Sequence, residues 1–356
     1  MITIFTPSFA DASNTNAQNL TVKEIVARLP PERFRVQMFF SSTPDARIAA
    51  RRNTELMPFR KYGNTALALG RCLLSRPDVY FFPREGPLDA AFLFWRRHLR
   101  LRTALVTYVV FALDRTEPGA MLARTIREAD VVAGNSAYVA ETVSHRFGKS
   151  VTTIHSGIRQ EVFFPPTEAR SGRERLTVLY AGSFQKRKRV DLVIREAGKW
   201  PNVRFRLAGC GEEEAACRAL VEQLGCHNVE FLGHLPSTAL GDEMRGAEVF
   251  LFPSVLEGHP QVLGQAAGCG LPCVAMDVYR PDYVVNGATG FLVRSETELS
   301  EKLEILLTQP ELRHSMSAAA VELSLKFDWG RVVERWGQVF EGAVAQRRGS
   351  ALRISS

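Results

Sequence analysis

Four cations follow a glycine turn in the second half of the chain, in the stretch Ala181–Arg189 (AGSFQKRKR). A β-like run precedes this stretch and a helical run follows it, which predicts a strand-to-helix turn. Glycine lets the backbone approach a ligand closely, and the start of a helix favours negative charge. The pattern therefore indicates phosphate binding, and a solvated loop remains the alternative.

A second pattern of this kind lies in residues 252–265 (FPSVLEGHPQVLGQ). Pro260 suits the first turn of a helix, where its missing N–H has no cost. We expect the next backbone amides to form an anion cradle, contributed by Gln261, Val262 and Leu263. Glu257 and Gln265 could then face one ligand, and Gly258 would permit its close approach. As alternatives, Glu257 is a helix-start carboxylate and Gln265 a solvated polar residue.

The remaining composition excludes several classes of protein. The N-terminus (Met1–Pro7) has neither a positive segment nor an apolar run of secretory length, so we expect a first strand there. No window approaches the ~20 uncharged apolar residues that a membrane span needs. The six cysteines are irregularly spaced and form no paired C-x-x-C units. We therefore expect reduced thiols in a cytoplasmic protein without a metal site.

The net charge of +7 is concentrated in the first half, where residues 1–170 carry 23 Lys and Arg against 15 Asp and Glu. Its densest stretch is Trp95–Arg102 (WRRHLRLR), an aromatic residue followed by clustered cations. One interpretation is a solvated helix face with long arginine side chains. The other is a surface attracted to anionic lipid or an anionic acceptor, which predicts peripheral association with the inner face of the membrane.

The chain is longer than the size at which one core usually stops growing, so we expect two domains. Short β-branched runs alternate with amphipathic stretches, which is typical of parallel α/β sheets. In the first half we expect strands near 2–6, 35–40, 79–82, 104–110, 131–133 and 151–154, and helices over 19–29 and 136–147, the latter capped by Ser136 and Gly148. In the second half we expect strands near 176–182, 203–208, 229–232, 249–251 and 273–275, helices over 190–196 and from 260, and a last helix over 329–346. The resulting domains are 1–163 and 175–328, joined by a linker at 164–174 and followed by the helix 329–346, which crosses back to the first domain.

Six motifs occur in a fixed order in the second half: LAGCGE (207–212), VEFLGH (229–234), AEVFLFPS (247–254), EG to QAA (257–267), GLP (270–272) and NGATGFLV (286–293). With these motifs the stretch 154–342 resembles the C-terminal domain of retaining glycosyltransferase family 4. The first half is similar to the family's acceptor domain only loosely, through its opening strand, the stretch 129–136 and Ser156–Ile158. The resemblance implies an α/β protein of the GT-B fold, in which two Rossmann-like, doubly wound domains face a central cleft.

The resemblance also implies roles for individual residues. Lys188 would meet the donor diphosphate and Glu257 the hydroxyls of the donor sugar, so we expect these two as catalytic residues. Gln265 would hold the ribose, and His234 would lie near the nucleobase. The full set of expected donor-binding residues is Gly182, Ser183, Arg187, Gly209, Gly211, His234, Ser254, Gly258, His259, Pro260, Gln261, Val262 and Gln265. On the acceptor side we expect Asn14, Thr15 and Asn16.

The implied activity is transfer of a hexosyl group from a UDP- or GDP-sugar, with retained configuration and no metal, in envelope or exopolysaccharide synthesis. The acceptor would be a saccharide or a lipid-linked saccharide. The chain has no Asp-x-Asp motif and no recognisable nucleic-acid module. Ser183 and Gln265 stand where the family usually has Arg and Glu, which keeps open a protein that binds nucleotide-sugar or glycan without transfer. A nucleotide-sugar epimerase on the same fold is the other alternative.

Overall fold

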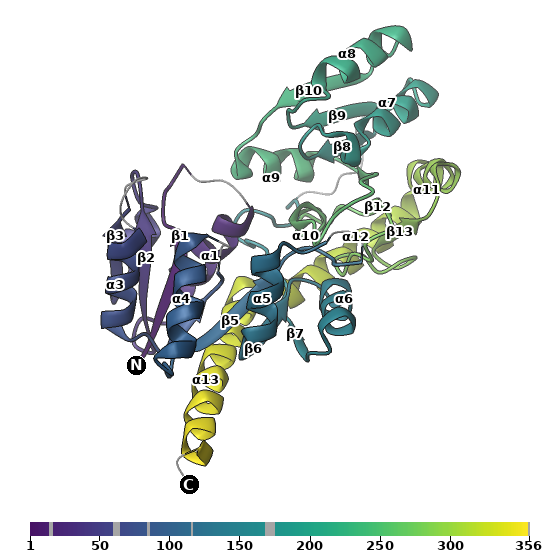
Figure 1. The fold of residues 1–356 in the computed structure, drawn as a ribbon. Coiled ribbons are helices and arrows are strands. Elements are labelled where there is room, and N and C mark those ends of the chain that lie inside the picture. Colours follow the sequence, from purple (N-terminus) through teal and green to yellow (C-terminus); the bar gives the residue numbers. More distant parts are fainter. Residues whose placement is uncertain (14–16, 60–64, 84–85, 115–116, 168–174, 355–356) are drawn as a thin grey trace. The chain divides into compact units, whose positions relative to one another are not determined.

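The computed structural model describes residues 1–13, 17–59, 65–83, 86–114, 117–167 and 175–354. The chain divides into two compact units, and Figure 1 shows a parallel sheet with flanking helices in each. The first unit comprises Met1–Ser156 and Trp329–Ser356, and the second comprises Gly157–Asp328. Part of the expected linker, residues 168–174, lies outside the described residues.

The first unit contains a seven-stranded parallel sheet with the order β3-β2-β1-β4-β5-β6-β7. Its strands are β1 (Ile2–Phe9), β2 (Phe34–Phe40), β3 (Thr54–Pro58), β4 (Val79–Phe81), β5 (Ala104–Val109), β6 (Val131–Gly134) and β7 (Val151–Thr153). Its helices are α1 (Ala17–Arg28), α2 (Ala46–Ala49), α3 (Thr65–Ser75), α4 (Pro87–His98), α5 (Ala120–Glu128), α6 (Ala137–Phe147) and α13 (Trp329–Ile354). Parallel neighbours need crossover helices, which the alternating sequence pattern supplies.

Local signals in the sequence fix the ends of α6 as expected. The Ser136 hydroxyl accepts a hydrogen bond from the Val139 amide at 3.1 Å, which caps one of the free N–H groups of the first turn. Gly148 adopts a φ of 64° just after the last turn, a conformation that glycine tolerates without strain.

The last helix, α13, completes the core of the first unit although it is the last element in the chain. Trp336 is fully buried, and its ring centre lies 4.9 Å from that of Phe81 on β4 and 5.0 Å from that of Tyr108 on β5. Trp329 and Phe340 belong to the same cluster. The apolar spacing along α13 thus corresponds to one face packed on the sheet.

The second unit contains a six-stranded parallel sheet with the order β10-β9-β8-β11-β12-β13. Its strands are β8 (Thr177–Ala181), β9 (Arg204–Ala208), β10 (Val229–Gly233), β11 (Val249–Phe252), β12 (Cys273–Met276) and β13 (Gly290–Val293). Its helices are α7 (Val190–Lys199), α8 (Glu214–Gln223), α9 (Ser237–Gly246), α10 (Gln261–Gly268), α11 (Glu296–Thr308) and α12 (Pro310–Ser324), with 3-10 turns η1 (Lys186–Lys188) and η2 (Leu325–Phe327). The expected fold class, two doubly wound parallel sheets, is confirmed.

Two strands, β3 and β13, were not expected from the sequence. Both lie at an edge of their sheet, β3 beside β2 and β13 beside β12. They are short, with the sequences TELMP and GFLV, and neither shows a regular alternation of apolar and polar residues. Pairing with the neighbouring strand, rather than local preference, makes these segments extended.

Three further observations concern sites and compartments. All six cysteines are free thiols. Within the described ranges, no group of three or more His, Cys, Asp or Glu is arranged to hold a metal ion. Among the helices that the structure describes, none combines the length and the apolar character needed to cross a membrane.

Candidate functional site

The carboxyl ends of β8 and β11 lie next to each other in the second sheet, because these two strands pair at Val249 with Val178 and at Phe250 with Leu179. The strand order reverses at this pair, with β9 on one side and β12 on the other. In open parallel α/β sheets, ligands bind outside the carboxyl ends of strands at such a switch point. The stretches 181–189 and 252–265 both begin at these two strand ends.

Glu257 joins the two stretches through a single oxygen, Oε1. Lys188 Nζ lies 2.5 Å from this oxygen and Arg187 Nη1 lies 3.0 Å from it. The Ser254 hydroxyl donates to it at 2.5 Å. Arg187 Nη1 also donates to the carbonyl of Leu256 at 2.8 Å. The structure thus brings Lys188 and Glu257, the two expected catalytic residues, into direct contact.

The Lys188 side chain is largely shielded from solvent, and only 9 % of the residue is exposed. Its ammonium nitrogen lies 5.0 Å from the centre of the Phe252 ring. Burial lowers the pKa of Lys188, and the Glu257 carboxylate opposes this shift. A cation in such low-dielectric surroundings acts more strongly on a nearby anion than one in water. The geometry therefore suits the expected role of Lys188 toward a diphosphate, which stays a prediction.

Two glycine turns at the ends of β8 and β9 pack backbone against backbone. A Cβ on Gly209, whose φ is 142°, would lie 1.9 Å from the Gly182 carbonyl oxygen. A Cβ on Gly211 would lie 2.4 Å from the Phe184 carbonyl oxygen, and the Phe184 amide donates to the Cys210 carbonyl at 2.9 Å. The close contact between the two turns therefore by itself requires glycine at positions 209 and 211.

The start of α10 differs from the expected anion cradle in one respect. Pro260 is the N-cap and the helix begins at Gln261. The Leu263 amide donates to the Pro260 carbonyl at 3.1 Å, so this amide is used within the first helical turn. The prediction that Leu263 contributes to the cradle is wrong, because the helix start is tightened by an i to i+3 bond.

The other expected donor residues differ in burial and in the strand that they follow. His259 is buried, and its ring centre lies 4.0 Å from that of Tyr283. Gln265 is partly buried within α10. His234 is exposed and directly follows β10, which β9 separates from β8. Ser183 is exposed in the turn after β8, and the Tyr180 hydroxyl donates to its carbonyl at 3.1 Å.

On the acceptor side, Asn14, Thr15 and Asn16 lie outside the described residues. The loop just before them is fixed by Asp11, whose carboxylate accepts the amides of Ser41 and Ser42, each at 2.8 Å. Burial alone would raise the pKa of Asp11, but hydrogen bonds from these serines outweigh it and lower the pKa. Asp11 is therefore a charged anchor at the end of β1.

Sequence reasoning missed Tyr279, which follows β12 at the same edge of the sheet. Its side chain is buried, and its hydroxyl has no hydrogen-bond partner among the described residues. Burial raises its pKa, and the charge of Glu257 acts in the same direction. A residue placed one strand further along the carboxyl edge could have been found by the rule that all parallel strands end there.

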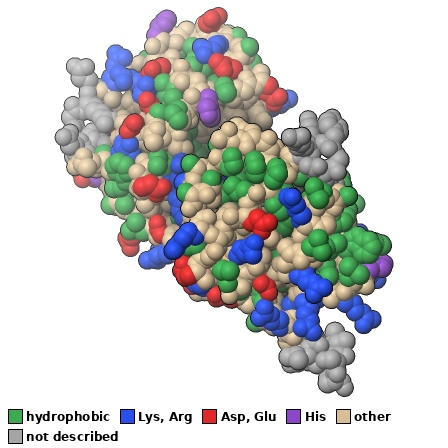
Figure 2. Space-filling model, turned by 90° about the vertical axis from the view of Figure 1, so that its left-hand side faces the viewer, with side chains coloured by type: hydrophobic (Ala, Val, Ile, Leu, Met, Phe, Trp, Pro, Cys, Tyr) green, Lys and Arg blue, Asp and Glu red, His purple; other side chains and the backbone are tan. Residues whose placement is uncertain are grey.

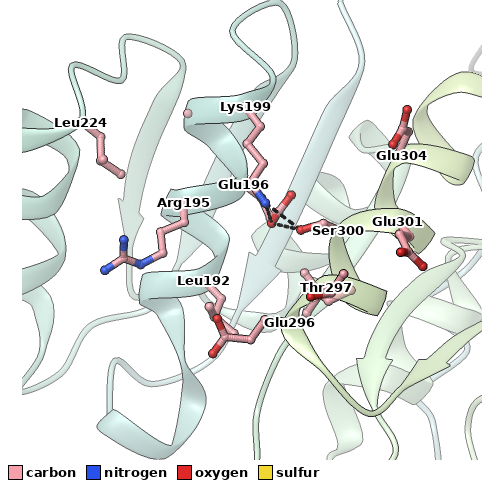
Figure 3. A pocket seen from close by; sticks show the side chains of 12 residues that line it. Leu192, Arg195, Glu196, Lys199, Leu224, Glu296, Thr297, Ser300, Glu301 and Glu304 are labelled. Atoms are coloured by element: carbon pink, nitrogen blue, oxygen red, sulfur yellow. Dashed lines mark hydrogen bonds and ion pairs between the residues drawn. The ribbon is translucent and has the colours of Figure 1, made fainter.

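A cavity of about 660 Å³ lies elsewhere, between α7 and α11. Figure 3 shows its polar lining, in which Glu196 accepts hydrogen bonds from Lys199 at 2.8 Å and from Ser300 at 2.5 Å. None of the expected donor residues lines it. The cavity is therefore distinct from the residues gathered at β8 and β11.

The two Rossmann-like units define the class of the protein as GT-B. Solved structures of similar fold include Anabaena HepE in complex with UDP and glucose, with a TM-score of 0.77 at 15% identity over 96% of this chain and 100% of that one. Sucrose-phosphate synthase from Thermosynechococcus elongatus gives a TM-score of 0.78 at 18% identity over 97% and 100%. At these identities the likeness concerns the fold alone.

The family follows from sequence comparison. Residues 166–322 match the family model of glycosyl transferases group 1. Through this region the chain belongs to the group 1 glycosyl transferases, glycosyltransferase family 4. A D-inositol 3-phosphate glycosyltransferase of Kribbella flavida is 30% identical over 245 residues, 61% of this chain and 58% of the relative. One of Acidothermus cellulolyticus is 30% identical over 269 residues, 67% and 59%. The chain thus spans about three fifths of the length of these curated relatives.

The shared oxygen of Glu257 predicts an asymmetry between two substitutions. Glu257→Leu leaves the buried ammonium of Lys188 without its carboxylate, which should cost about 3 kcal/mol of unfolding free energy. Lys188→Met leaves Glu257 with Arg187 and Ser254 and should cost about 1 kcal/mol. Urea denaturation measures both values, and equal losses would contradict the assigned pairing.

The lowered pKa of Lys188 predicts a dependence of stability on pH. In the unfolded chain this lysine has its ordinary pKa of 10.5, so between its folded pKa and 10.5 the unfolded chain binds more protons. The contribution of Lys188 to the unfolding free energy therefore rises with pH in this window. We expect wild type to gain stability relative to Lys188→Met as the pH rises through the alkaline range toward 10.5. If the stability difference between wild type and Lys188→Met falls as the pH rises over this range, the prediction is wrong.

Proposed function

We propose that this chain transfers a hexosyl group from a UDP- or GDP-sugar to a saccharide or lipid-linked saccharide, with retained configuration and without a metal, in envelope or exopolysaccharide synthesis. The observation that carries the proposal is the contact of Lys188 with Glu257 at the switch point of a Rossmann-like sheet. The match of residues 166–322 to the group 1 glycosyl transferases supports it.

In the proposed reaction, the bond from the anomeric carbon of the sugar to the diphosphate oxygen breaks, and a bond from that carbon to an acceptor hydroxyl oxygen forms. The acceptor proton passes to the departing phosphate, so the protein needs no separate base. Lys188 stabilises the negative charge that grows on the diphosphate, with Arg187 beside it. Glu257 hydrogen-bonds hydroxyls of the donor sugar, and Gln265 the ribose.

The names of similar proteins support the donor and acceptor classes. HepE was solved with UDP-glucose, and a further neighbour of similar fold is a lipopolysaccharide outer core galactosyltransferase, WaaB, with a TM-score of 0.74 at 16% identity over 98% of this chain and 100% of that one. These names favour a UDP-sugar over a GDP-sugar and an envelope saccharide as acceptor.

Lys188→Ala should lower turnover more than about tenfold, because the departing diphosphate loses its buried counter-charge. The assay is release of free nucleotide from UDP-, GDP-, ADP- and dTDP-sugars after a thermal-shift screen. Lys199→Ala is the matched control, because this lysine also pairs with a glutamate, Glu196, but lies on the exposed side of α7. Near-wild-type transfer by Lys188→Ala would refute the role of this lysine.

The same screen separates the alternative functions. A nucleotide-sugar that binds to wild type without release of nucleotide favours a binding protein. Isomerisation of the sugar without release favours an epimerase.

The end of α4 forms a surface that mixes apolar and cationic groups. Phe94, Trp95 and Leu99 are 46 %, 39 % and 54 % exposed. Exposed cations alternate with them at Arg97, Arg100 and Arg102. Arg96 instead points inward, forming an ion pair with Asp130 and donating from Nε to the Thr103 carbonyl at 3.1 Å. Figure 2 shows a face of the molecule on which hydrophobic and Lys or Arg side chains lie side by side.

Exposed aromatic rings next to cations suit the boundary between lipid headgroups and acyl chains, and each cation near an anionic surface contributes about 1 kcal/mol. We propose that the surface at Phe94–Arg102 contacts an anionic membrane and brings the first unit to a lipid-linked acceptor. The structure favours this over a fully solvated face, since the aromatic residues are exposed together with the cations.

The double variant Phe94→Ser with Trp95→Ser should bind vesicles containing about 30% phosphatidylglycerol at least tenfold more weakly than wild type, because it removes the apolar part of the surface. Cosedimentation measures the partition. Leu224→Ser with Leu325→Ser, which removes two residues of similar exposure from the second unit, is the control. Equal partition of wild type and the Phe94 and Trp95 variant would exclude this surface.

A further inference from the structure

An unfavourable backbone conformation lies directly beside the candidate site. Arg189 follows Lys188 and has a φ of 51° and a ψ of 44°, in the left-handed region. Residues with a side chain rarely adopt this region, because the Cβ approaches the following carbonyl oxygen. Such a conformation persists only where its surroundings hold it, and it often occurs at functional sites.

The guanidinium of Arg189 supplies the contacts that hold it. Nε donates to Oδ1 of Asp191 and Nη2 donates to Oδ2, both at 3.0 Å. Asp191 lies in the first turn of α7. Nη2 also donates at 2.8 Å to Glu296 Oε1, at the start of α11. Figure 3 shows Glu296 on α11 across from Leu192 on α7. The forked pairing with Asp191 fixes the direction of the guanidinium as well as its position.

The other side of η1 is held by the loop after β11. The Arg187 carbonyl accepts the Val255 amide at 2.9 Å. Within the turn itself, the Lys188 amide donates to the Gln185 carbonyl at 2.8 Å, and the Arg189 amide donates to the Lys186 carbonyl at 3.3 Å. Because a three-residue turn has so few bonds of its own, these outside contacts decide where Lys188 points.

We propose that Arg189 is a positioning residue for Lys188, which ties the end of η1 to α7 and α11 so that the Lys188 ammonium stays buried against Glu257. This inference rests on the proposed function in that Lys188 meets the donor diphosphate. It adds a requirement beyond the expected donor-binding residues: Arg189, which is not one of them, sets the affinity for the nucleotide diphosphate through Lys188.

Arg189→Gly separates the backbone from the side chain, because glycine adopts the left-handed region freely but cannot pair with Asp191 or Glu296. We expect this variant to expose Lys188, so that an amine-acetylating reagent modifies it at least fivefold faster than in wild type, as measured by mass spectrometry. Asp191→Asn and Glu296→Gln, which each weaken one contact, should give smaller increases. Arg206→Ala is the control, because Arg206 also pairs with two carboxylates, Glu230 and Glu243, and should leave Lys188 protected.

The affinity for UDP, measured by calorimetry, gives a second readout. Arg189→Gly should weaken UDP binding about fivefold in wild type and less than twofold in the Lys188→Ala background, because the effect passes through that lysine. An unchanged acetylation rate of Lys188 in Arg189→Gly overturns the inference, and so does a loss of UDP affinity that persists in full without Lys188. If wild type binds no nucleotide diphosphate, the proposed function fails, and the acetylation rate still decides the role of Arg189.

Discussion

The burial of the Lys188 ammonium constrains the loops at the carboxyl ends of β8 and β11 in the second unit. A charge in such surroundings needs a partner at short range, and Glu257 provides it at 2.5 Å. The two residues come from loops after different strands, so their contact requires β8 and β11 to be neighbours with aligned ends. Parallel pairing at the switch point provides this alignment. Because Arg187 and Ser254 share the same carboxylate oxygen, the loops are joined as one polar cluster.

The turns around this cluster are fixed mostly by backbone contacts. Gly209 and Gly211, which follow β9, allow the turns after β8 and β9 to touch at a distance that no side chain would permit. On the opposite side, the Val255 amide in the loop after β11 donates to the Arg187 carbonyl. The Arg189 side chain pairs with Asp191 while its backbone adopts the left-handed conformation. The site therefore consists of short segments that neighbouring elements keep in place, which is the kind of support that a preorganised electrostatic site requires.

The first six strands of the first unit are ordered like the six strands of the second, and β7 is added at the edge, but the charged groups of the two units are arranged differently. At the end of β1, the Asp11 carboxylate accepts the backbone amides of Ser41 and Ser42 and anchors the loop that precedes the expected acceptor residues. The Lys23 ammonium donates to the backbone carbonyl of Asp11 at 2.8 Å. The cations of this unit divide between structure and surface. Arg96 is buried and pairs with Asp130, whereas Arg97, Arg100 and Arg102 are exposed beside Phe94 and Trp95. The charge excess seen in composition thus belongs partly to a buried ion pair and partly to exposed arginines, which we propose contact lipid.

The sequence by itself determined the alternation of strands and helices, the caps of α6, the two parallel sheets, and the stretches around Lys188 and Glu257, because periodicity, capping and glycine turns act over a few residues. Only the tertiary structure decided what depends on neighbours distant in the chain. Edge strands β3 and β13 are extended because a partner strand pairs with them. The Leu263 amide is used by its own helix turn, Tyr279 is buried after the neighbouring strand β12, and Arg189 reaches Glu296, 107 residues away. Such contacts depend on how the sheet edge brings loops together, which no local pattern encodes.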